Sequence, residues 1–428
     1  MSLLLDIVYL VVALVTAPFW MRKARGGWAE RFGRVERLPP KNEKPRLMLH
    51  AVSVGETNLL RALVDDLRQD HDVVVSCTTD TGIARARELF TGKAHVVRYP
   101  LDASWSVRRF LDTVRPDAVA LAELELWPNF ARACARRGVP LAIINGRLSD
   151  RSHGRYRMAR PLMGTYFAGL RFVSVQDETY AQRFIRAGAR PERVHIVGSM
   201  KWDAAPVIAE GADVPGAAEL ARAMGIDAAK PLIVAGSTAP DEHALLLDAT
   251  PPGVQLLCAP RRPEWFDLAA ADLAGCVRRS TGTGDPTVGR FLLDTIGELR
   301  MAYALADVVV VGRSFGDLHG SDPMEPAALG KPVIIGPAHA DFRTAVETMR
   351  EDGAIVVATR ETLAKELERL LNNDDDRETM GRAARACVET NRGATARTAA
   401  MLREMAARVG GGTPAPAPAA PEPMGATR

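Results

Sequence analysis

Residues 46–78, RLMLHAVSVGETNLLRALVDDLRQDHDVVVSCT, decide the fold class of this 428-residue chain. The run RLMLHAV predicts a strand, a helix is expected from about Gly55, and HDVVVSCT predicts a second strand. Both strand runs are apolar throughout rather than alternating, which is typical of strands covered on both faces. Strand, helix and strand in this order indicate a βαβ unit and a parallel sheet.

The same alternation of apolar runs and amphipathic stretches continues in two series along the chain. They are separated by residues 205–220, APVIAEGADVPGAAEL, which are rich in Ala, Gly and Pro. The chain length also favours two domains of about 200 residues each. We therefore expect an α/β protein with two Rossmann-like domains facing each other across a cleft, residues 22–205 and 206–409. A Gly/Pro/Ala-rich disordered tail is expected at 410–428.

The N-terminal stretch SLLLDIVYLVVALVTAPFW, residues 2–20, is apolar and precedes a basic segment. Its core, residues 7–20, is shorter than the ~20 residues of a clean transmembrane helix. Between Arg22 and Arg46 there are nine basic residues against three acidic ones. We expect a membrane anchor at residues 1–21, spanning or half-inserted, with a basic collar facing anionic head groups on the cytoplasmic side. A buried amphipathic helix in a soluble protein is the alternative.

Composition and missing motifs exclude several functions. A net charge of +3 is too small to indicate a nucleic-acid partner. The five cysteines include no C-x-x-C pair, which argues against a disulfide framework or zinc knuckle and fits a reducing cytoplasm. The chain has no P-loop motif, and no G-x-G-x-x-G follows the first strand. Asp374-x-Asp376 is interpreted as a solvated turn and helix cap, so we expect neither a metal nor a cofactor.

Several groups able to do chemistry lie at predicted strand ends in the first half. Ser53-x-x-Glu56 forms a capping box, but Glu56 also lies where open α/β sheets bind their ligands; both interpretations stay open. Glu123 and Glu125 follow a buried strand run, either as site carboxylates or as a cap of the next helix. Lys201 follows the last strand of this half and is a candidate to bind a sugar carboxylate or phosphate, with a surface salt bridge as the alternative.

The second half carries a set typical of a nucleotide site. Small residues and hydroxyls at a strand-to-helix turn let a phosphate approach the backbone, although they also make an ordinary helix cap. Arginine binds phosphate or carboxylate with two hydrogen bonds, and a carboxylate near a helix start can hold ribose hydroxyls. The candidate residues are Gly236, Ser237 and Thr238; Pro260, Arg261 and Arg262; Gly297, Glu298 and Leu299; and Asp322, Pro323, Met324 and Glu325.

Eight motifs, taken in order, resemble those of the membrane-associated 3-deoxy-D-manno-octulosonic acid (Kdo) transferases of Gram-negative lipopolysaccharide synthesis. They are HAVSVGE, ELELWPN, NGRLSDRS, GSMKWD, GSTAPDEH, PRRPEWF, DTIGEL and MEPAALGKPVIIGP. The resemblance runs from the anchor to about Phe342. It implies a GT-B glycosyltransferase fold, with the acceptor bound mainly by the first domain and the CMP-activated sugar by the second. It also implies metal-independent, inverting transfer of Kdo from CMP-Kdo to a lipid A precursor (lipid IVA) at the cytoplasmic face of the inner membrane.

The resemblance also implies roles for individual residues. Glu56 matches the family's general base, while Glu125 and Lys201 match residues assigned to transition-state stabilisation. The segments that match the family's CMP contacts are Pro260 with Arg261, Gly297 to Leu299, and Asp322 to Glu325.

One departure from the family pattern concerns the donor. Asp322 stands where the family has asparagine, and an aspartate only accepts hydrogen bonds and repels an anionic donor. Arg262, in place of histidine, adds a cation that can offset this repulsion. Three alternatives therefore stay open: a related GT-B transferase with another nucleotide sugar or lipid acceptor, a membrane-tethered binding protein, and a nucleotide-sugar epimerase, which has no use for the anchor. The number of Kdo residues transferred is also left open.

Overall fold

The computed structural model describes two compact units of the chain. The described residues are 26–41, 43–148, 160–205, 212–282 and 287–408, with the single residues Asp6, Tyr9, Ser152, Gly154, Tyr156, Met158, Val207, Gly284 and Asp285. Apart from Asp6 and Tyr9, the expected anchor lies outside this set, as does the expected tail at 410–428.

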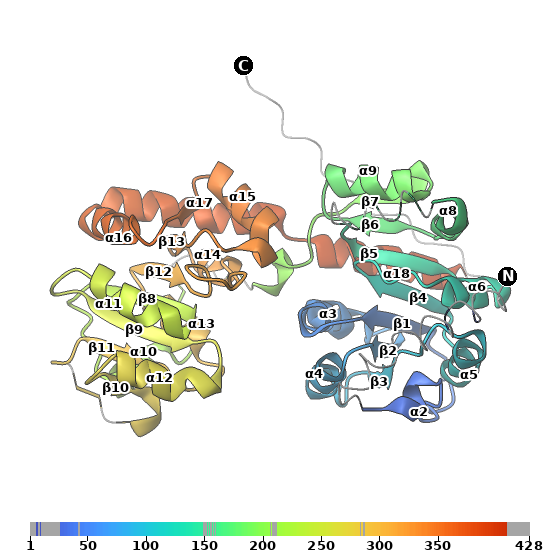
Figure 1. The fold of residues 1–428 in the computed structure, drawn as a ribbon, viewed down its shortest axis with the longest axis horizontal. Coiled ribbons are helices and arrows are strands. Elements are labelled where there is room, and N and C mark those ends of the chain that lie inside the picture. Colours follow the sequence, from blue (N-terminus) through green and yellow to red (C-terminus); the bar gives the residue numbers. More distant parts are fainter. Residues whose placement is uncertain are drawn as a thin grey trace, which may run out of the picture. The chain divides into compact units, whose positions relative to one another are not determined.

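The first unit is built on a parallel sheet of seven strands in the order β3-β2-β1-β4-β5-β6-β7 (Figure 1). The strands are β1 (Arg46–Ala51), β2 (Asp72–Cys77), β3 (His95–Arg98), β4 (Ala118–Ala122), β5 (Leu141–Gly146), β6 (Val173–Val175) and β7 (Val194–Ile196). The helices are α2 (Trp28–Arg31), α3 (Val54–Leu67), α4 (Asp80–Phe90), α5 (Ser104–Val114), α6 (Pro128–Arg136), α8 (Arg160–Ala168), α9 (Glu178–Ala187) and α18 (Ala394–Ala407). The order of β3 to β6 is that of a doubly wound Rossmann sheet.

Both faces of this sheet are apolar, which explains the continuous apolar runs in the sequence. Leu47 and Leu49 of β1 pack under α3, α4 and α18. Met48, between them, packs on the other face under α5, α6, α8 and α9. Successive strand residues point to opposite faces, so a strand buried on both sides cannot alternate in hydropathy.

The second unit repeats the architecture with a seven-stranded parallel sheet in the order β10-β11-β9-β8-β12-β13-β14. The strands are β8 (Leu232–Thr238), β9 (Gln255–Pro260), β10 (Val277–Arg278), β11 (Arg290–Leu292), β12 (Val308–Val311), β13 (Val333–Ile335) and β14 (Ile355–Val357). The helices are α10 (Ala217–Met224), α11 (His243–Ala249), α12 (Phe266–Asp272), α13 (Leu299–Leu305), α14 (Met324–Ala328), α15 (Arg343–Glu351), α16 (Leu363–Asn372) and α17 (Asp374–Asn391). The two-residue strand β10 was not predicted from the sequence.

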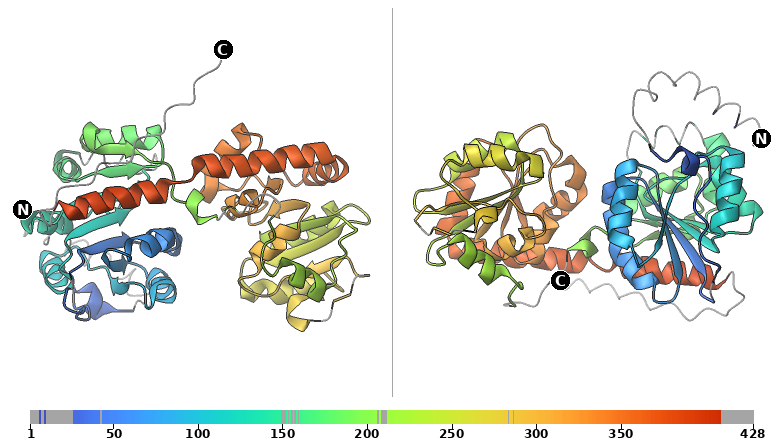
Figure 2. Two further views of the ribbon diagram at one scale, coloured as in Figure 1. Left: turned by 180° about the vertical axis from the view of Figure 1, so that it is seen from behind. Right: turned by 90° about the horizontal axis from the view of Figure 1, so that it is seen from below.

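The last helix corrects the expected domain boundaries. Residues 206–409 were assigned to the second domain, but the second unit is Ala204–Asn391 and the chain returns to the first unit at Arg392. There α18 buries Leu402 and Met405 against the α3 side of the sheet, as Figure 2 also shows. The carboxylate of Asp203 accepts the N–H groups of Gly393 and Thr395, each at 2.6 Å, and so caps α18. No local pattern in the sequence indicates this long-range cap.

None of the helices in the described part of the chain is both long and apolar enough to cross a membrane.

Candidate active site

Glu56 lies in the first turn of α3, directly after the carboxyl end of β1. Its Oε2 accepts the N–H of Val52 at 2.8 Å, and its Oε1 accepts the hydroxyl of Ser53 at 3.0 Å. Ser53 is the N-cap of α3 and its Oγ in turn accepts the N–H of Glu56. The expected capping box is therefore present in modified form, because the returning bond comes from Val52 and not from the backbone of Ser53.

Two more carboxylates gather beside Glu56. Glu123 and Glu125 follow β4, the strand that pairs with β1. Glu123 adopts a left-handed backbone (φ 54°), and Glu125 accepts the indole N–H of Trp127 at 2.9 Å. The chain leaves β1 and β4 in opposite directions along the sheet, and ligands of open α/β sheets bind at such a switch point. We term the carboxyl ends of β1 and β4, with these three glutamates, the acid edge.

The acid edge changes the protonation of its members. Burial raises the pKa of Glu56 to about 7, and the charges of Glu123 and Glu125 raise it further, whereas the bonds from Val52 and Ser53 lower it. Burial and the charge of Glu123 also raise the pKa of Glu125. A carboxylate with a pKa near neutrality can accept a proton from a hydroxyl and release it again, which suits a general base.

The backbone of Lys201 is held at the same edge of the sheet. The N–H of Met200 donates to Oδ1 of Asn145 at 3.0 Å, and Asn145 lies near the end of β5, beside β4. Within the described residues no ion pair joins Lys201 to Glu56 or Glu125, so the structure places the three on one edge without a direct contact.

In the second unit, Gly236, Ser237 and Thr238 end β8 as predicted. A Cβ at Gly236 would overlap the hydroxyl of the buried Tyr303, so only glycine fits there. Ser237 has a left-handed backbone (φ 56°). The hydroxyl of Thr238 is hydrogen bonded to Nε2 of His243 at 3.0 Å, which uses it inside the unit.

Asp322, Glu325 and Arg261 surround the Tyr303 hydroxyl. Burial raises the pKa of Tyr303, the charges of Glu325 and Asp322 raise it further, and Arg261 lowers it. Oδ1 of Asp322 accepts the N–H of Met324 at 2.8 Å, at the start of α14. An asparagine could accept this bond equally well, so the substitution matters only for the second oxygen of Asp322. Pro323 and Met324 are buried below this turn.

The remaining predicted nucleotide residues flank this group. Pro260 ends β9, and the N–H of Arg261 donates to the carbonyl of Thr238 at 3.0 Å. Gly297 has a left-handed backbone (φ 94°) and Leu299 begins α13, the helix that carries Tyr303. The Glu298 carboxylate is paired with Arg279 at 2.9 Å, which together with Thr295 lowers its pKa. Its side chain is therefore bound within the unit.

Two residues of this edge were missed from the sequence. Glu242 is fully buried, and its carboxylate accepts the N–H groups of Ala239, Arg313, Ser314 and Phe315 at 2.8 to 3.1 Å. It thereby ties the end of β8 to the loop after β12. Arg313 stands in that loop with a left-handed backbone (φ 58°). The signal available was a charged residue directly after the run DVVVVG, at a strand end like the others.

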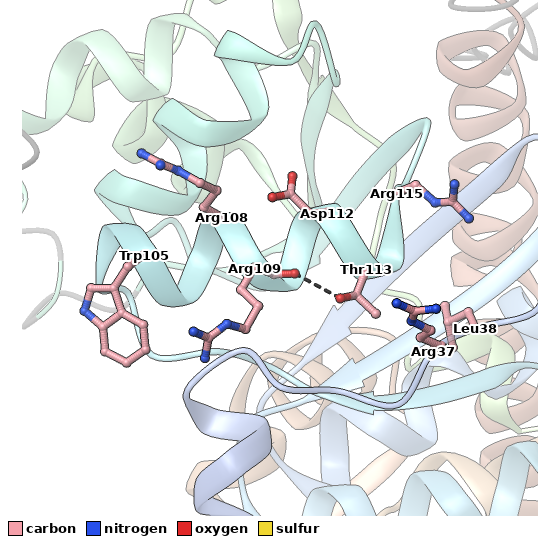
Figure 3. Close-up of a pocket in the computed structure, with 8 residues that line it drawn as sticks. All are labelled: Arg37, Leu38, Trp105, Arg108, Arg109, Asp112, Thr113 and Arg115. Atoms are coloured by element: carbon pink, nitrogen blue, oxygen red, sulfur yellow. Dashed lines mark hydrogen bonds between the residues drawn. The ribbon is translucent and has the colours of Figure 1, made fainter.

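Exposed aromatic side chains and arginines gather on one side of the first unit. The ring of Phe32 lies 5.9 Å from that of Trp28 and 5.5 Å from that of Trp105 on α5, and the Arg109 guanidinium lies over Trp105. Arg108 and Arg109 project from the same helix beside an open hollow of about 630 Å³ (Figure 3). We term these five residues the arginine–tryptophan surface.

Part of the expected anchor is bound close by. The Asp6 carboxylate accepts the N–H of Ser104 at 2.9 Å and the amide of Asn129 at 3.1 Å. The Tyr9 hydroxyl donates to Asp102 at 3.0 Å. Both described residues of the N-terminal stretch therefore lie at the N-terminal ends of α5 and α6.

No group of three or more His, Cys, Asp or Glu residues within the described ranges is arranged to hold a metal ion. The Asp374-x-Asp376 pair begins α17, and its carboxylates pair with Arg377 and Arg369. The interpretation of this pair as a helix cap with solvated charges therefore fits.

Comparison with known proteins agrees with this geometry. Residues 26–204 match the sequence profile of the family described as 3-deoxy-D-manno-octulosonic-acid transferase (kdotransferase). A 3-deoxy-D-manno-octulosonic acid transferase from Bordetella pertussis is 33% identical over 416 residues, covering 90% of this chain and 95% of that relative. One from Haemophilus influenzae is 30% identical over 394 residues, covering 88% and 90%.

Solved structures agree at the level of the fold. A glycosyltransferase from Rickettsia africae has a TM-score of 0.59 at 12% identity, covering 86% of this chain and 99% of that one. The Anabaena protein HepE in complex with UDP has a TM-score of 0.56 at 16% identity, covering 84% and 100%. Both likenesses extend over the two sheets and identify the GT-B architecture. The chain therefore belongs to the 3-deoxy-D-manno-octulosonic acid transferase family and is a glycosyltransferase with a GT-B fold.

Proposed function

We propose that this chain transfers Kdo from CMP-Kdo to a hydroxyl of a lipid A precursor, with inversion and without a metal ion. The observation that carries the proposal is Glu56, a desolvated carboxylate with a pKa near 7 at the switch point of the first sheet. In the proposed step Glu56 takes the acceptor's hydroxyl proton, the acceptor oxygen bonds to the anomeric carbon, and the bond from that carbon to the phosphate oxygen breaks. CMP leaves with the bonding electrons.

The other residues stabilise charge in this step. Kdo carries a carboxylate on its anomeric carbon, and positive charge develops there as CMP departs. We assign Lys201 to the sugar carboxylate, Glu125 to the developing cation and Arg261 to the departing phosphate. Because phosphate binding is assigned to arginine, we expect transfer to persist in the presence of a chelator.

Nucleotide titration of the full chain tests the donor. We expect CMP to bind more tightly than UDP, and tighter binding of UDP contradicts the CMP-Kdo assignment. The alternative, a transferase of the same fold with another nucleotide sugar, then takes its place. Asp322 is the observation that keeps this alternative in view.

We further propose that the enzyme works at the cytoplasmic face of the inner membrane, with the arginine–tryptophan surface on anionic head groups. Aromatic rings favour the membrane interface, and a basic residue near an anionic surface contributes about 1 kcal/mol. Asp6 and Tyr9 bind beside this surface, which brings the apolar N-terminal stretch to the same side.

Vesicle sedimentation tests the membrane proposal. Arg108→Glu with Arg109→Glu is expected to lower binding to vesicles containing phosphatidylglycerol and to leave weak binding to pure phosphatidylcholine unchanged. Arg61→Glu on α3, which packs on the other face of the sheet, is the matched control. Equal losses in the two proteins would argue against a specific surface.

A further inference from the structure

Three neighbouring strands of the second unit carry arginines or a strained turn at their carboxyl ends. Arg261 and Arg262 follow β9, Ser237 and Thr238 end β8, and Arg313 follows β12. The sheet order β9-β8-β12 puts the two arginine segments on either side of β8. The switch point of this sheet lies between β8 and β12, so Arg313 occupies the position in the second unit that Glu123 occupies in the first.

The backbone of Arg313 is fixed from both sides. Its N–H donates to Oε2 of Glu242 at 2.8 Å, and its carbonyl accepts the N–H of Gly320 at 2.8 Å. These bonds hold it at φ 58°, a conformation that side chains other than glycine adopt at a cost in free energy. Strain of this kind persists where the surrounding structure enforces it, and it concentrates at ligand sites.

Like charges meet around the Arg313 side chain. Partial burial lowers the pKa of Arg313, and the guanidinium groups of Arg261 and Arg262 lower it further, against the charges of Asp341 and Glu242. The Glu242 carboxylate is already saturated by four backbone N–H groups. In the described part of the chain, Arg261, Arg262 and Arg313 form no ion pair within 4 Å, and Arg262 only stacks on Trp265 at 4.9 Å.

We propose that Arg313 binds the phosphate of the nucleotide, together with Arg261, and so sets the affinity of this enzyme for its donor. An anionic phosphate between the two guanidinium groups removes their mutual repulsion and forms charge-assisted hydrogen bonds with both. The inference rests on the proposed function for the location of the donor. It does not depend on the base, because the phosphate is common to CMP and UDP.

Arg313 also accounts for the departure at Asp322. An aspartate near Tyr303 and Arg261 adds negative charge to a site for an anionic donor. A third arginine at the same edge restores the positive balance. The two residues are therefore expected to be coupled, so that the donor affinity lost with Arg313 is partly regained when Asp322 becomes neutral.

Calorimetric titration of the full chain with CMP tests the proposal. Arg313→Gly is expected to weaken CMP binding about 10- to 100-fold, the range of a hydrogen bond between charged groups. Its melting temperature is expected to equal or exceed that of the wild type, because glycine relieves both the backbone strain and the charge repulsion. Adding Asp322→Asn is expected to recover part of the lost affinity.

Arg115→Gly is the matched control. Arg115 has the same left-handed conformation (φ 49°) at the end of α5, in the first unit. Both glycine variants remove one charge and one strained residue, but only Arg313→Gly is expected to change CMP binding. Should Arg313→Gly fail to fold, Arg313→Gln carries the same test.

Unchanged CMP affinity in a folded Arg313 variant overturns the inference. Tighter binding of UDP than CMP by the wild type contradicts the proposed donor instead. In that case the effect of Arg313 is still expected, with UDP as the probe, so the two failures are distinguishable.

Discussion

The carboxyl edges of the two sheets occupy the same topological position and carry opposite chemistry. At the switch point of the first unit, between β1 and β4, lie Glu56, Glu123 and Glu125. At that of the second, between β8 and β12, the charged group is Arg313, with Arg261 on the neighbouring strand. One edge gathers acids whose pKa is raised, and the other gathers cations that repel one another.

This difference shows where function lies in a duplicated architecture. The sheets use the same strand order and the same fully apolar strands, so the scaffold does not distinguish the units. A few residues just beyond the strand ends do, and each edge holds its like charges together by backbone hydrogen bonds. We interpret the acid edge as the proton acceptor and the arginine-bearing edge as the binder of the phosphate. The predictions below test whether this division holds.

The largest effect is expected for Glu56→Gln. Glutamine can still accept the N–H of Val52, but it cannot take a proton from the acceptor. Turnover is expected to fall by about 10²- to 10⁴-fold, the usual contribution of a general base. The measurement is transfer of Kdo from CMP-Kdo to a lipid A precursor under saturating substrates.

Glu88→Gln is the control for this change. Glu88 lies on α4 with its side chain 67% exposed and paired to Arg85, so its loss is expected to leave turnover unchanged. Near-normal turnover in the Glu56 variant would mean that this carboxylate only caps α3.

A smaller effect is expected for Arg261→Gln at the other edge. The KM for the donor is expected to rise about 10- to 100-fold through the loss of a charge-assisted bond to phosphate. The pH dependence of turnover is expected to stay as in the wild type, because the base is untouched. Arg290→Gln, at the amino end of β11, is the control. A change in the pH profile with an unaltered KM would reverse the roles of the two edges.

Neutralising Glu123 is expected to move the pH profile by a modest amount. Turnover of the wild type should rise with pH and level off above a midpoint near the Glu56 pKa of about 7. The charge of Glu123 raises that pKa, so Glu123→Gln should shift the midpoint to lower pH and speed the reaction on the acidic side. A midpoint that stays in place, or moves upward, contradicts the coupling of the two carboxylates.

The smallest effect is expected on stability. The pKa of Glu56 is raised from 4.5 to about 7 in the folded chain, so the folded state binds more protons than the unfolded state in this window. The free energy of unfolding therefore falls as pH rises from 4.5 to 7, by about 1–3 kcal/mol from this group. Glu56→Gln should flatten that part of the curve and be the more stable protein at higher pH. Denaturant unfolding across this range measures it.

The sequence was sufficient for most of the scaffold. Apolar strand runs and their spacing predicted both parallel sheets, and the residues at the strand ends predicted which edges carry the sites. The prediction failed where long-range contacts decide the structure. Helix α18 packs with the first unit because Asp203 caps it across 190 positions of sequence, and no pattern local to either segment indicates that contact.

The site was predictable by residue type but not by chemistry. Glu56 was recognisable as both a cap and a candidate base, yet only the packing of Glu123 and Glu125 beside it explains its raised pKa. Glu242 and Arg313 were missed because their roles depend on a buried carboxylate joining two loops 71 positions apart. The pairing of Glu298 with Arg279 was equally invisible in the motif that contains Glu298.

The most direct test of the division between the edges is to measure CMP affinity and turnover in one preparation of the Glu56→Gln enzyme. The account predicts a CMP dissociation constant within about twofold of the wild type, because distant sites act independently, and a turnover at least about 100-fold lower. A variant that loses CMP affinity in parallel with turnover, or that keeps its turnover, would contradict the assignment of proton transfer to the acid edge.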